Sequence, residues 1–381
     1  MRRLYAFTLA LFFLAVPSAL AASFGVSMNG SNEVPLGDTN GVGFADLILE
    51  GTTLRYAVVV YNVDRPTAMH VHPGRRGETG PPIIPLPEPF VRLEGCPGLG
   101  APLCGERWAT LGTVELDVET ADDLVINPAV FYLNVHNEAH PSGAVRGQVQ
   151  FARYLPVVGR TRGAAQTNWF TRLAAVNPSV SSTSEWSVEI IPQSPYGSTS
   201  RFTSEQTPIG PLHLSVVTDF NVNDLDGIGA ARILSDQDLA VTAAIYNGSA
   251  GERGDFGYNV HGLALENART SGVLMDLANS SASDFAARMG HRTNIGFFNP
   301  EIYPVEAIFR AFDSDGTTLG QTVISIPAWS MVQVPVFELF DDVPESARVS
   351  DSFWVRWQTG HPIFVYATVV NNATGDPEFR D

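Results

Sequence analysis

Histidine spacing is the feature of this sequence that most directly indicates chemistry. His70 and His72 are separated by one residue, and His136 and His140 follow in a second motif further along the chain. Residues two apart on a β-strand point to the same face of the strand. His70 and His72 therefore share a face, and three imidazoles converge if the strand that carries His136 is a neighbour. The candidate metal ligands are His70, His72 and His136.

Two interpretations of this histidine cluster stay open at the level of sequence. Three neutral imidazoles suit copper, zinc or nickel, and Asn134 or Glu138 could orient one ring from outside the ligand set. Alternatively, the rings form a buried hydrogen-bonded network near the end of a sheet, which Arg146 closes in a structural role. His140 precedes Pro141 in a turn, and we expect it to be exposed rather than a fourth ligand.

The elements that must position these side chains are β-strands, because the chain has the pattern of an all-β protein. Short apolar or alternating runs are separated by Gly, Pro, Asn and Asp, as the turns of a β-sandwich require. The 34 glycines and 26 prolines leave little room for long helices, and only residues 283–289 and 336–340 look like short helical turns. Predicted strands in the N-terminal part span residues 43–49, 54–61, 125–135 and 144–151.

The first residues have the pattern of a secretion signal. Arg2 and Arg3 precede an apolar segment, Leu4–Val16, and small residues up to Ala21 form a cleavage site. We therefore expect cleavage near Ala21 and a secreted or periplasmic protein. The apolar segment is too short to span a bilayer, and no later segment is long enough, so we expect no membrane span.

Charge and cysteine content narrow the classes of partner and compartment. The formal net charge is −17 and the chain has no lysine, which argues against nucleic acid or an anionic membrane as partner. Cys96 and Cys104 flank a turn-rich segment, and in an oxidising compartment we expect them to close this loop as a structural disulfide. The pair lacks the Cys-x-x-Cys spacing that would indicate a thiol metal site.

An internal repeat organises the C-terminal part of the sequence. Residues 232–247 match residues 356–371 at a constant offset of 124, and residues 171–178 match 293–300 at an offset of 122. Two motifs in the same order indicate two copies of one unit. The alternating apolar residues of these motifs have the pattern of a buried strand face. We therefore predict two related β-sandwich repeats.

The N-terminal part resembles the CHRD domain, the repeat named from chordin and widespread in exported bacterial proteins. The resemblance covers about residues 23–152 and implies an all-β Greek-key sandwich in an extracellular setting. It implies no reaction, because the family is defined by sequence rather than by chemistry. The matching motifs lie at residues 28–35, 68–72, 80–82, 132–136 and 143–149.

A weaker similarity of the same module is to copper/zinc superoxide dismutase. That resemblance places His70, His72 and His136 on copper-ligand positions and Arg146 on the substrate-guiding arginine. The sequence departs from that family because no histidine lies between His72 and His136, so the metal-bridging ligand and the zinc cluster are missing. Both cysteines also lie in one loop, whereas that family's disulfide joins a loop to the last strand.

Other patterns favour structural interpretations. Asp219–Gly227 spaces oxygen side chains like a calcium loop, but the twelfth position is Ala230 rather than glutamate, so we expect an acidic turn. Asp313–Gly316 has the Asp-Gly signal of a hairpin turn. No Gly-x-Ser-x-Gly elbow is present. We expect core positions rather than a carbohydrate-binding face for the tryptophans Trp169, Trp186, Trp329, Trp354 and Trp357.

Together these patterns predict an all-β protein, in which a CHRD-like Greek-key β-sandwich precedes two related β-sandwich repeats. We favour an exported, non-enzymatic binding or adhesion protein, whose partner is an unknown extracellular protein or glycan. The alternative is an enzyme, a copper-binding oxidoreductase similar to the dismutases, with His70, His72 and His136 as ligands. Copper or zinc is the cofactor that such a site would hold. The expected division is a signal peptide at 1–21, a CHRD-like domain at 22–153, and repeats at 154–257 and 258–381.

Overall fold

The computed structural model describes most of the chain after the expected signal segment. Residues 1–20, both cysteines Cys96 and Cys104, and most of the acidic segment after Asp219 lie outside the described residues. Within the described residues the protein is all-β with three short α-helices, which confirms the predicted fold class. The described ranges are 21–93, 106–163, 167–193, 202–203, 207–217, 227–248, 256–340 and 349–381.

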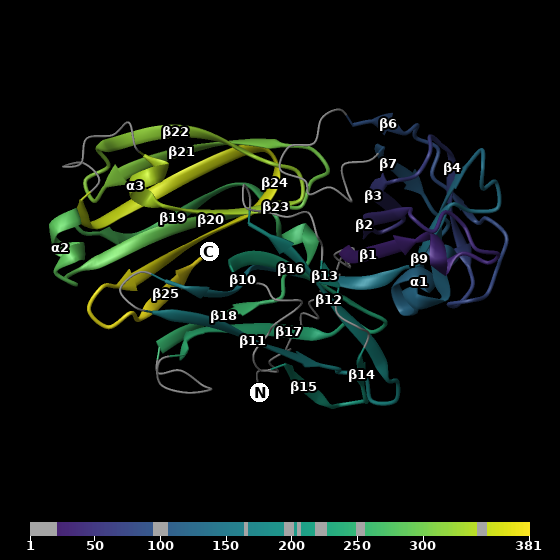
Figure 1. The fold of residues 1–381 in the computed structure, drawn as a ribbon, viewed down its shortest axis with the longest axis horizontal. Helices are drawn as coiled ribbons and strands as arrows, with labels where there is room; N and C mark the ends of the chain where they lie inside the picture. Colours follow the sequence, from purple (N-terminus) through teal and green to yellow (C-terminus); the bar gives the residue numbers. More distant parts are fainter. Residues whose placement is uncertain are drawn as a thin grey trace, which may run out of the picture.

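The N-terminal module is a sandwich of antiparallel strands, drawn in purple and blue in Figure 1. Strands β1, β2, β3 and β7 are successive neighbours, and β4, β8 and β9 form a second group. Both groups contribute side chains to one apolar core. The strands are β1 (Ala21–Asn29), β2 (Val42–Glu50), β3 (Thr53–Tyr61), β4 (Pro66–Pro73), β5 (Ile84–Pro85), β6 (Val91–Arg92), β7 (Arg107–Glu115), β8 (Phe131–Asn137) and β9 (Val145–Gln148).

The helix α1 (Val118–Ile126) was missed by the sequence prediction. It begins after Asp117, whose side chain accepts a hydrogen bond in the first turn and so satisfies one of the free N–H groups there. Ala121 and Leu124, three residues apart, are buried against the sandwich core. The strand predicted from residue 125 was therefore wrong in its first part, because β8 begins only at Phe131.

Strand β10 (Gln150–Arg162) leads from the N-terminal module into the rest of the chain. It pairs with β1 near its start and with β16 along most of its length. The sequence indicated two strands here, ending near Phe151 and restarting at Tyr154, and the structure joins them into one. The boundary expected near residue 153 falls inside this strand.

Two units with the same strand order follow, here named repeat 1 (β10–β18) and repeat 2 (β19–β25). The helices predicted in repeat 2 are present as α2 (Ala282–Ala286) and α3 (Val336–Leu339). The strands of repeat 1 after β10 are β11 (Asn168–Val176), β12 (Ser184–Pro192), β13 (Phe202–Thr203), β14 (Thr207–Ile209), β15 (Leu214–Val217), β16 (Gly227–Ser235), β17 (Ala240–Asn247) and β18 (Phe256–His261). Those of repeat 2 are β19 (Arg269–Asn279), β20 (His291–Asn299), β21 (Val305–Asp313), β22 (Thr318–Ile326), β23 (Ser330–Pro335), β24 (Ser350–Asn371) and β25 (Pro377–Arg380).

Strand pairing shows that the two repeats are related in three dimensions. In repeat 1 the two sequence motifs pair with each other as β11 and β17, with Thr171 opposite Ile245. In repeat 2 they pair as β20 and β24, with Thr293 opposite Val369, at the same offsets of 122 and 124 that the sequence shows. The prediction of two related β-sandwich repeats is therefore confirmed.

The asparagine that ends each motif performs the same task in both repeats. Asn177 and Asn299 are fully buried, and each donates its side-chain N–H groups to carbonyls of a later segment. Each side-chain oxygen accepts a hydrogen bond from the backbone two residues on. Buried amides of this kind fix the path of the chain after a strand, because unpaired polar groups are costly in the interior.

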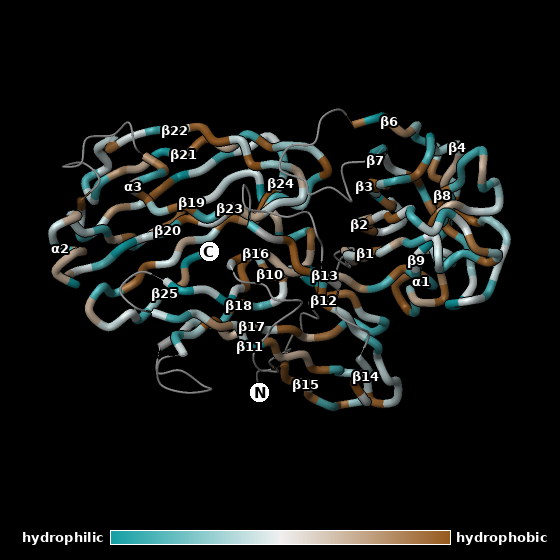
Figure 2. The backbone as a smooth tube through the Cα atoms, in the orientation of Figure 1, coloured by the Kyte–Doolittle hydropathy of each residue, from teal (hydrophilic) through white to brown (hydrophobic). Residues whose placement is uncertain are grey.

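Polar and apolar residues alternate along many of these strands (Figure 2), as expected for sheets with one face in a core. Trp186, Trp329 and Trp357 are buried, in agreement with the core prediction, whereas Trp169 and Trp354 are only partly buried. Asp313 accepts hydrogen bonds from two backbone N–H groups of the β21–β22 connection, which is the predicted hairpin turn. Among the described residues, no helix is both long and apolar enough to cross a membrane.

One arginine connects the N-terminal module to both repeats. Arg232 of β16 is fully buried and contacts Asp46 of β2 at 2.6 Å and Glu189 of β12 at 2.7 Å. Its guanidinium also lies 5.3 Å from the ring centre of Trp329 in repeat 2. Tyr154 donates its hydroxyl to the same Asp46 oxygen at 2.6 Å. The modules are therefore joined through a closed network of charges.

Candidate metal centre

The candidate site lies on the outer face of the β4–β8 pair in the N-terminal module. The two strands run antiparallel, with His70 opposite Asn134 and His72 opposite Tyr132. The residues that alternate with these histidines along β4, Met69 and Val71, have their side chains in the core. Because side chains alternate along a strand, the histidines must occupy the other face.

The three predicted ligands converge. Nδ1 of His70 lies 3.2 Å from Nε2 of His136, and one nitrogen from each of His70, His72 and His136 can be chosen so that all lie within 4.8 Å of one another. The predicted convergence of the rings is thus confirmed, and the proximity follows from the period-two spacing and the antiparallel register. Among the described residues, no other group of three or more His, Cys, Asp or Glu side chains is arranged so that it could hold a metal ion.

Backbone carbonyls fix the tautomers of two histidines, and the tautomer of His136 makes its Nε2 the acceptor of a hydrogen bond from Nδ1 of His70. Nδ1 of His72 lies 2.9 Å from the carbonyl of Gly80, and Nδ1 of His136 lies 3.1 Å from the carbonyl of Pro141. A carbonyl can only accept, so both Nδ1 atoms must carry the proton. The neutral rings therefore present unprotonated Nε2 atoms to the cluster. Nε2 of His72 is buried without a hydrogen-bond partner among the described residues.

The electrostatic environment keeps the three imidazoles neutral. Burial lowers the pKa of His70, His72 and His136 below the usual value, because the charged form loses hydration. Charge repulsion from His72 also lowers the pKa of His70, and His70 and His72 lower that of His136. Arg146 lowers the pKa of His72. The hydrogen bonds to Gly80 and Pro141 raise the pKa of His72 and His136, but by less than burial lowers it. Neutral rings are the form that binds a metal ion.

Arg146 reaches the cluster through Tyr132. The ring of Tyr132 stacks on His72 with centroids 4.9 Å apart, and the guanidinium of Arg146 lies 4.3 Å from the centre of the tyrosine ring. Arg146 is 2% exposed and donates to the carbonyl of Glu78. The arginine thus lies beside the site and contacts it through Tyr132.

Glu33 is a member of the site that the sequence reading missed. Its carboxyl is 5% exposed, beside Asn134 and Arg146. Burial raises its pKa to about 7, although the coulombic effect of Arg146 opposes the rise. Gly143 approaches this carboxyl so closely that a Cβ there would lie 2.5 Å from Oε2, and its φ is +144°. Glu33 and Gly143 both lie in motifs of the CHRD resemblance, and this was the signal in the sequence that could have identified Glu33.

The outer partners suggested by sequence were wrong. Glu138 is exposed, and Asn134 donates to Glu33 and to the carbonyl of Ser142 rather than contacting a ring. His140 is outside the cluster of three nitrogens. The carbonyls of Gly80 and Pro141, in the loops after β4 and β8, orient the rings, a role that we had expected of side chains.

The three nitrogens could hold a metal ion in tetrahedral or trigonal coordination if the rings moved slightly closer together. Bonds of about 2.0–2.1 Å to imidazole place ligand nitrogens about 3.3 Å apart in a tetrahedral site. The 3.2 Å pair already meets this spacing, and the widest pair, within 4.8 Å, has to close by at most about 1.5 Å. Three nitrogen ligands leave one position for water or another ligand.

Comparisons with known proteins identify only the module that carries this site. No curated protein matches the chain. Among solved structures, a calcium-binding mutant of β-glucuronidase 2 from Bacteroides uniformis aligns with 61% of this chain at 9% identity and a TM-score of 0.13. The chain spans about a quarter, 26%, of that enzyme, and so low a score supports no argument. Residues 24–149 match the family model of the CHRD domain, and the module with the three histidines is therefore a CHRD domain.

Proposed function

We propose that the CHRD domain binds one first-row transition-metal ion, zinc or copper, through Nε2 of His72 and His136 and Nδ1 of His70, whose proton moves to Nε2 of the same ring. We further propose that the chain is an exported, non-enzymatic binding protein in which this ion completes the outer face of the domain. The observation that carries the proposal is the convergence of three ring nitrogens within 4.8 Å.

The hydrogen bonds around the rings support a metal site over a purely structural network. A structural network should satisfy the buried nitrogen atoms, because an unpaired buried polar group costs roughly 1–3 kcal/mol. Nε2 of His72 has no such partner within the described structure. Carbonyls that fix the tautomer of metal-bound histidines are a common feature of metal sites, and Gly80 and Pro141 supply them here.

A copper-dependent oxidoreductase is the second candidate, favoured by the open fourth position that three ligands leave. The placement of Arg146 does not favour it. A guanidinium that attracts an anionic substrate must face solvent, whereas Arg146 is buried against Tyr132 and bonded to a backbone carbonyl. We therefore prefer a binding role for the site.

Calorimetric titration of the untagged, metal-stripped mature chain with zinc and with copper tests the proposal. We expect one site per chain. His70→Ala, His72→Ala and His136→Ala should each weaken binding by more than the roughly 10–100-fold that loss of an outer partner costs. His140→Ala is the matched control, because His140 lies in the same loop region outside the cluster, and it should bind like the native chain.

Two results would overturn parts of this proposal. Absence of one-site binding, or equal affinity of His136→Ala and His140→Ala, would refute the metal site and leave the structural network. Superoxide turnover by the copper-loaded chain, lost in His70→Ala, would replace the binding role by the oxidoreductase.

A further inference from the structure

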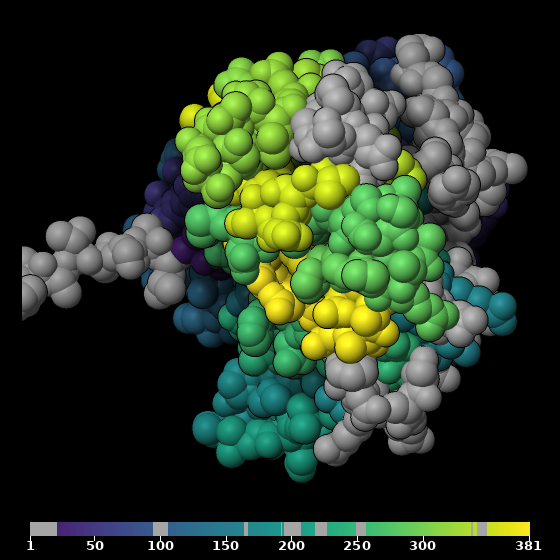
Figure 3. Space-filling view, turned by 90° about the vertical axis from the view of Figure 1, so that its left-hand side faces the viewer, coloured from purple at the N-terminus to yellow at the C-terminus, as the bar shows by residue number. Residues whose placement is uncertain are grey.

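A cavity of about 690 Å³ lies between repeat 1 and repeat 2, in the size range of roughly 300–1,000 Å³ that small-molecule sites occupy. Strands β10, β11 and β18 supply one side, and β20, β23 and β24 supply the other. The C-terminal strand β25, in yellow in Figure 3, lies between the two repeats and also contributes through Pro377. The cavity is far from the histidine cluster in sequence and belongs to different modules.

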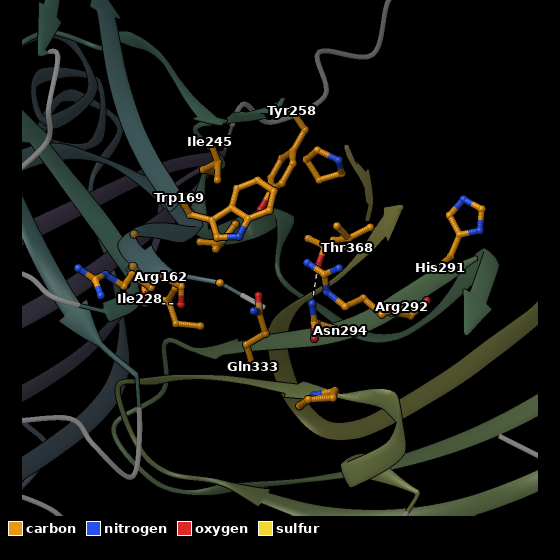
Figure 4. Close-up of a pocket in the computed structure, with 18 of the residues that line it drawn as sticks. Arg162, Trp169, Ile228, Ile245, Tyr258, His291, Arg292, Asn294, Gln333 and Thr368 are labelled. Atoms are coloured by element: carbon orange, nitrogen blue, oxygen red, sulfur yellow. Dashed lines mark hydrogen bonds between the residues drawn. The ribbon is translucent and has the colours of Figure 1, made fainter. Parts of the chain in front are cut away.

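Repeat 1 contributes a mainly apolar wall with two aromatic rings. Trp169 and Tyr258 extend into the space on one side, near Ile228 and Ile245 (Figure 4). Tyr258 is held in place by stacking on Phe379 of β25, with ring centroids 5.1 Å apart. Aromatic faces fixed in this way suit a flat or apolar ligand body, because they bury large area without losing much side-chain freedom.

Repeat 2 contributes polar groups, most of which can donate hydrogen bonds. Arg292, Asn294 and Gln333 lie across the space from Trp169 and Tyr258 (Figure 4). The side-chain oxygen of Gln333 accepts from the hydroxyl of Tyr366 at 2.8 Å, which leaves its amide N–H groups as donors. Arg292 donates to Asn372 at 2.9 Å.

Charge is distributed unevenly between the cavity and the rest of the chain. The chain carries a net charge of −17, yet the lining residues include Arg162 and Arg292 and no Asp or Glu among those that the structure describes. Burial lowers the pKa of Arg292, and no carboxylate of the described residues offsets this loss of hydration. A desolvated cation beside N–H donors and without a carboxylate gains most from an anionic ligand.

The geometry points to a binding site for an amphipathic organic acid in this cavity. The apolar or aromatic body of the ligand contacts Trp169 and Tyr258, and its carboxylate accepts hydrogen bonds from Arg292. The site is independent of the proposed metal centre, and its two walls come from the two copies of one repeat. Trp169 and His291, which both line it, occupy equivalent positions at the offset of 122.

Fluorescence titration of the mature chain with 1-pyrenebutyrate tests this proposal, with 1-pyrenebutanol as the neutral analogue of the same shape. We expect saturable binding of the acid at one site and binding of the alcohol at least about tenfold weaker, because a hydrogen bond to a charged partner contributes that much. Removing zinc and copper should leave both affinities unchanged.

Two variants and one control locate the site. Arg292→Gln should weaken binding of the acid by about tenfold or more and leave binding of the alcohol unchanged. Trp169→Ala removes a ring that contacts the ligand body and should weaken the acid and the alcohol alike. Arg310→Gln is the control, because Arg310 is an exposed arginine of the same repeat, bonded to Gln321 away from the cavity. Thermal unfolding of each variant verifies that it is folded.

The proposal fails if the acid does not bind, if acid and alcohol bind equally, or if Arg310→Gln weakens the acid as much as Arg292→Gln does. If Arg292→Gln does not fold, the ratio of acid to alcohol affinity in the native chain and the effect of Trp169→Ala decide. Unchanged binding of both probes by folded Trp169→Ala would refute the site.

Discussion

The histidine cluster and the Arg232 network are both buried polar groups in one chain, but they differ in the charges that the protein itself supplies. Arg232 contacts two carboxylates and two backbone carbonyls, so its charge has counterions within the protein. The histidine cluster holds three rings whose pKa values are lowered, and Nε2 of His72 is buried without a hydrogen-bond partner among the described residues.

This difference separates a structural role from a binding role. A network that contains its own counterions fixes how modules join, and removing one member leaves another charge buried and unpaired. A cluster that keeps its rings neutral and oriented, with nitrogens directed at one another, lacks a positive charge at its centre. We infer that the first region holds the molecule together and that the second takes its missing charge from an external ion.

The largest expected effect is on the Arg232 network. Arg232→Met leaves Asp46 and Glu189 buried without their counterion, and we expect it to lower the free energy of unfolding by about 3–5 kcal/mol. Thermal unfolding at neutral pH measures this. Arg356→Met is the matched control, because Arg356 occupies the same position in the repeat motif but is exposed, and we expect a change within about 0.5 kcal/mol. Equal effects of the two substitutions would refute the structural role that we infer for Arg232.

The second expected effect is on the histidine cluster. Zinc at 100 times its dissociation constant should stabilise the native chain by about 2.7 kcal/mol, and a chelator should reverse the shift. His136→Ala should abolish the shift. In Arg232→Met the shift should keep its size, because the two regions share no partner and distant effects add. A zinc shift that disappears in Arg232→Met would show that the two regions are coupled.

The features that the sequence predicted correctly are those that follow from a fixed spacing between residues. The spacing of His70 and His72 placed both rings on one face, and the offset between the two motifs predicted which strands pair in each repeat. These predictions succeeded because period two and a constant offset depend only on local backbone geometry. The helix after Asp117 was missed because the abundance of glycine and proline outweighed the cap and the spacing of Ala121 and Leu124.

Sequence could not predict what depends on contacts between distant segments. Arg232 and Arg356 are equivalent in the motif, yet Arg232 is buried against Asp46 of the CHRD domain and Arg356 is exposed. The carbonyls of Gly80 and Pro141 orient the rings, and no side-chain pattern marks a carbonyl. Glu33 lies in a recognisable motif, but its burial beside Gly143 required the fold.

A smaller effect is expected from the titration of Glu33, which borders the histidine cluster. Its folded pKa of about 7 lies above the unfolded value of 4.5, so the folded state retains this proton while the unfolded state loses it. The native chain should therefore lose stability as the pH rises from 4.5 to 7, by roughly 1–3 kcal/mol. Glu33→Gln removes the titrating group, and its unfolding temperature should exceed that of the native chain at pH 8 and match it at pH 4.5. A native-like pH dependence in Glu33→Gln would assign the titration to another group.

The smallest expected effect is the response of zinc affinity to mild acidity. Zinc must displace any proton on the three rings, and an unperturbed imidazole is half protonated near pH 6.5. Because the pKa of each ring is lowered, the rings carry fewer protons at that pH than unperturbed imidazoles would. The apparent dissociation constant, measured by calorimetry, should therefore rise less between pH 7.5 and 6.5 than it would for three unperturbed imidazoles. An affinity that falls over this range as steeply as for unperturbed imidazoles would contradict the lowered pKa values. Protons would then compete with zinc for the rings near neutral pH, and the metal-free cluster would not be held in the neutral form.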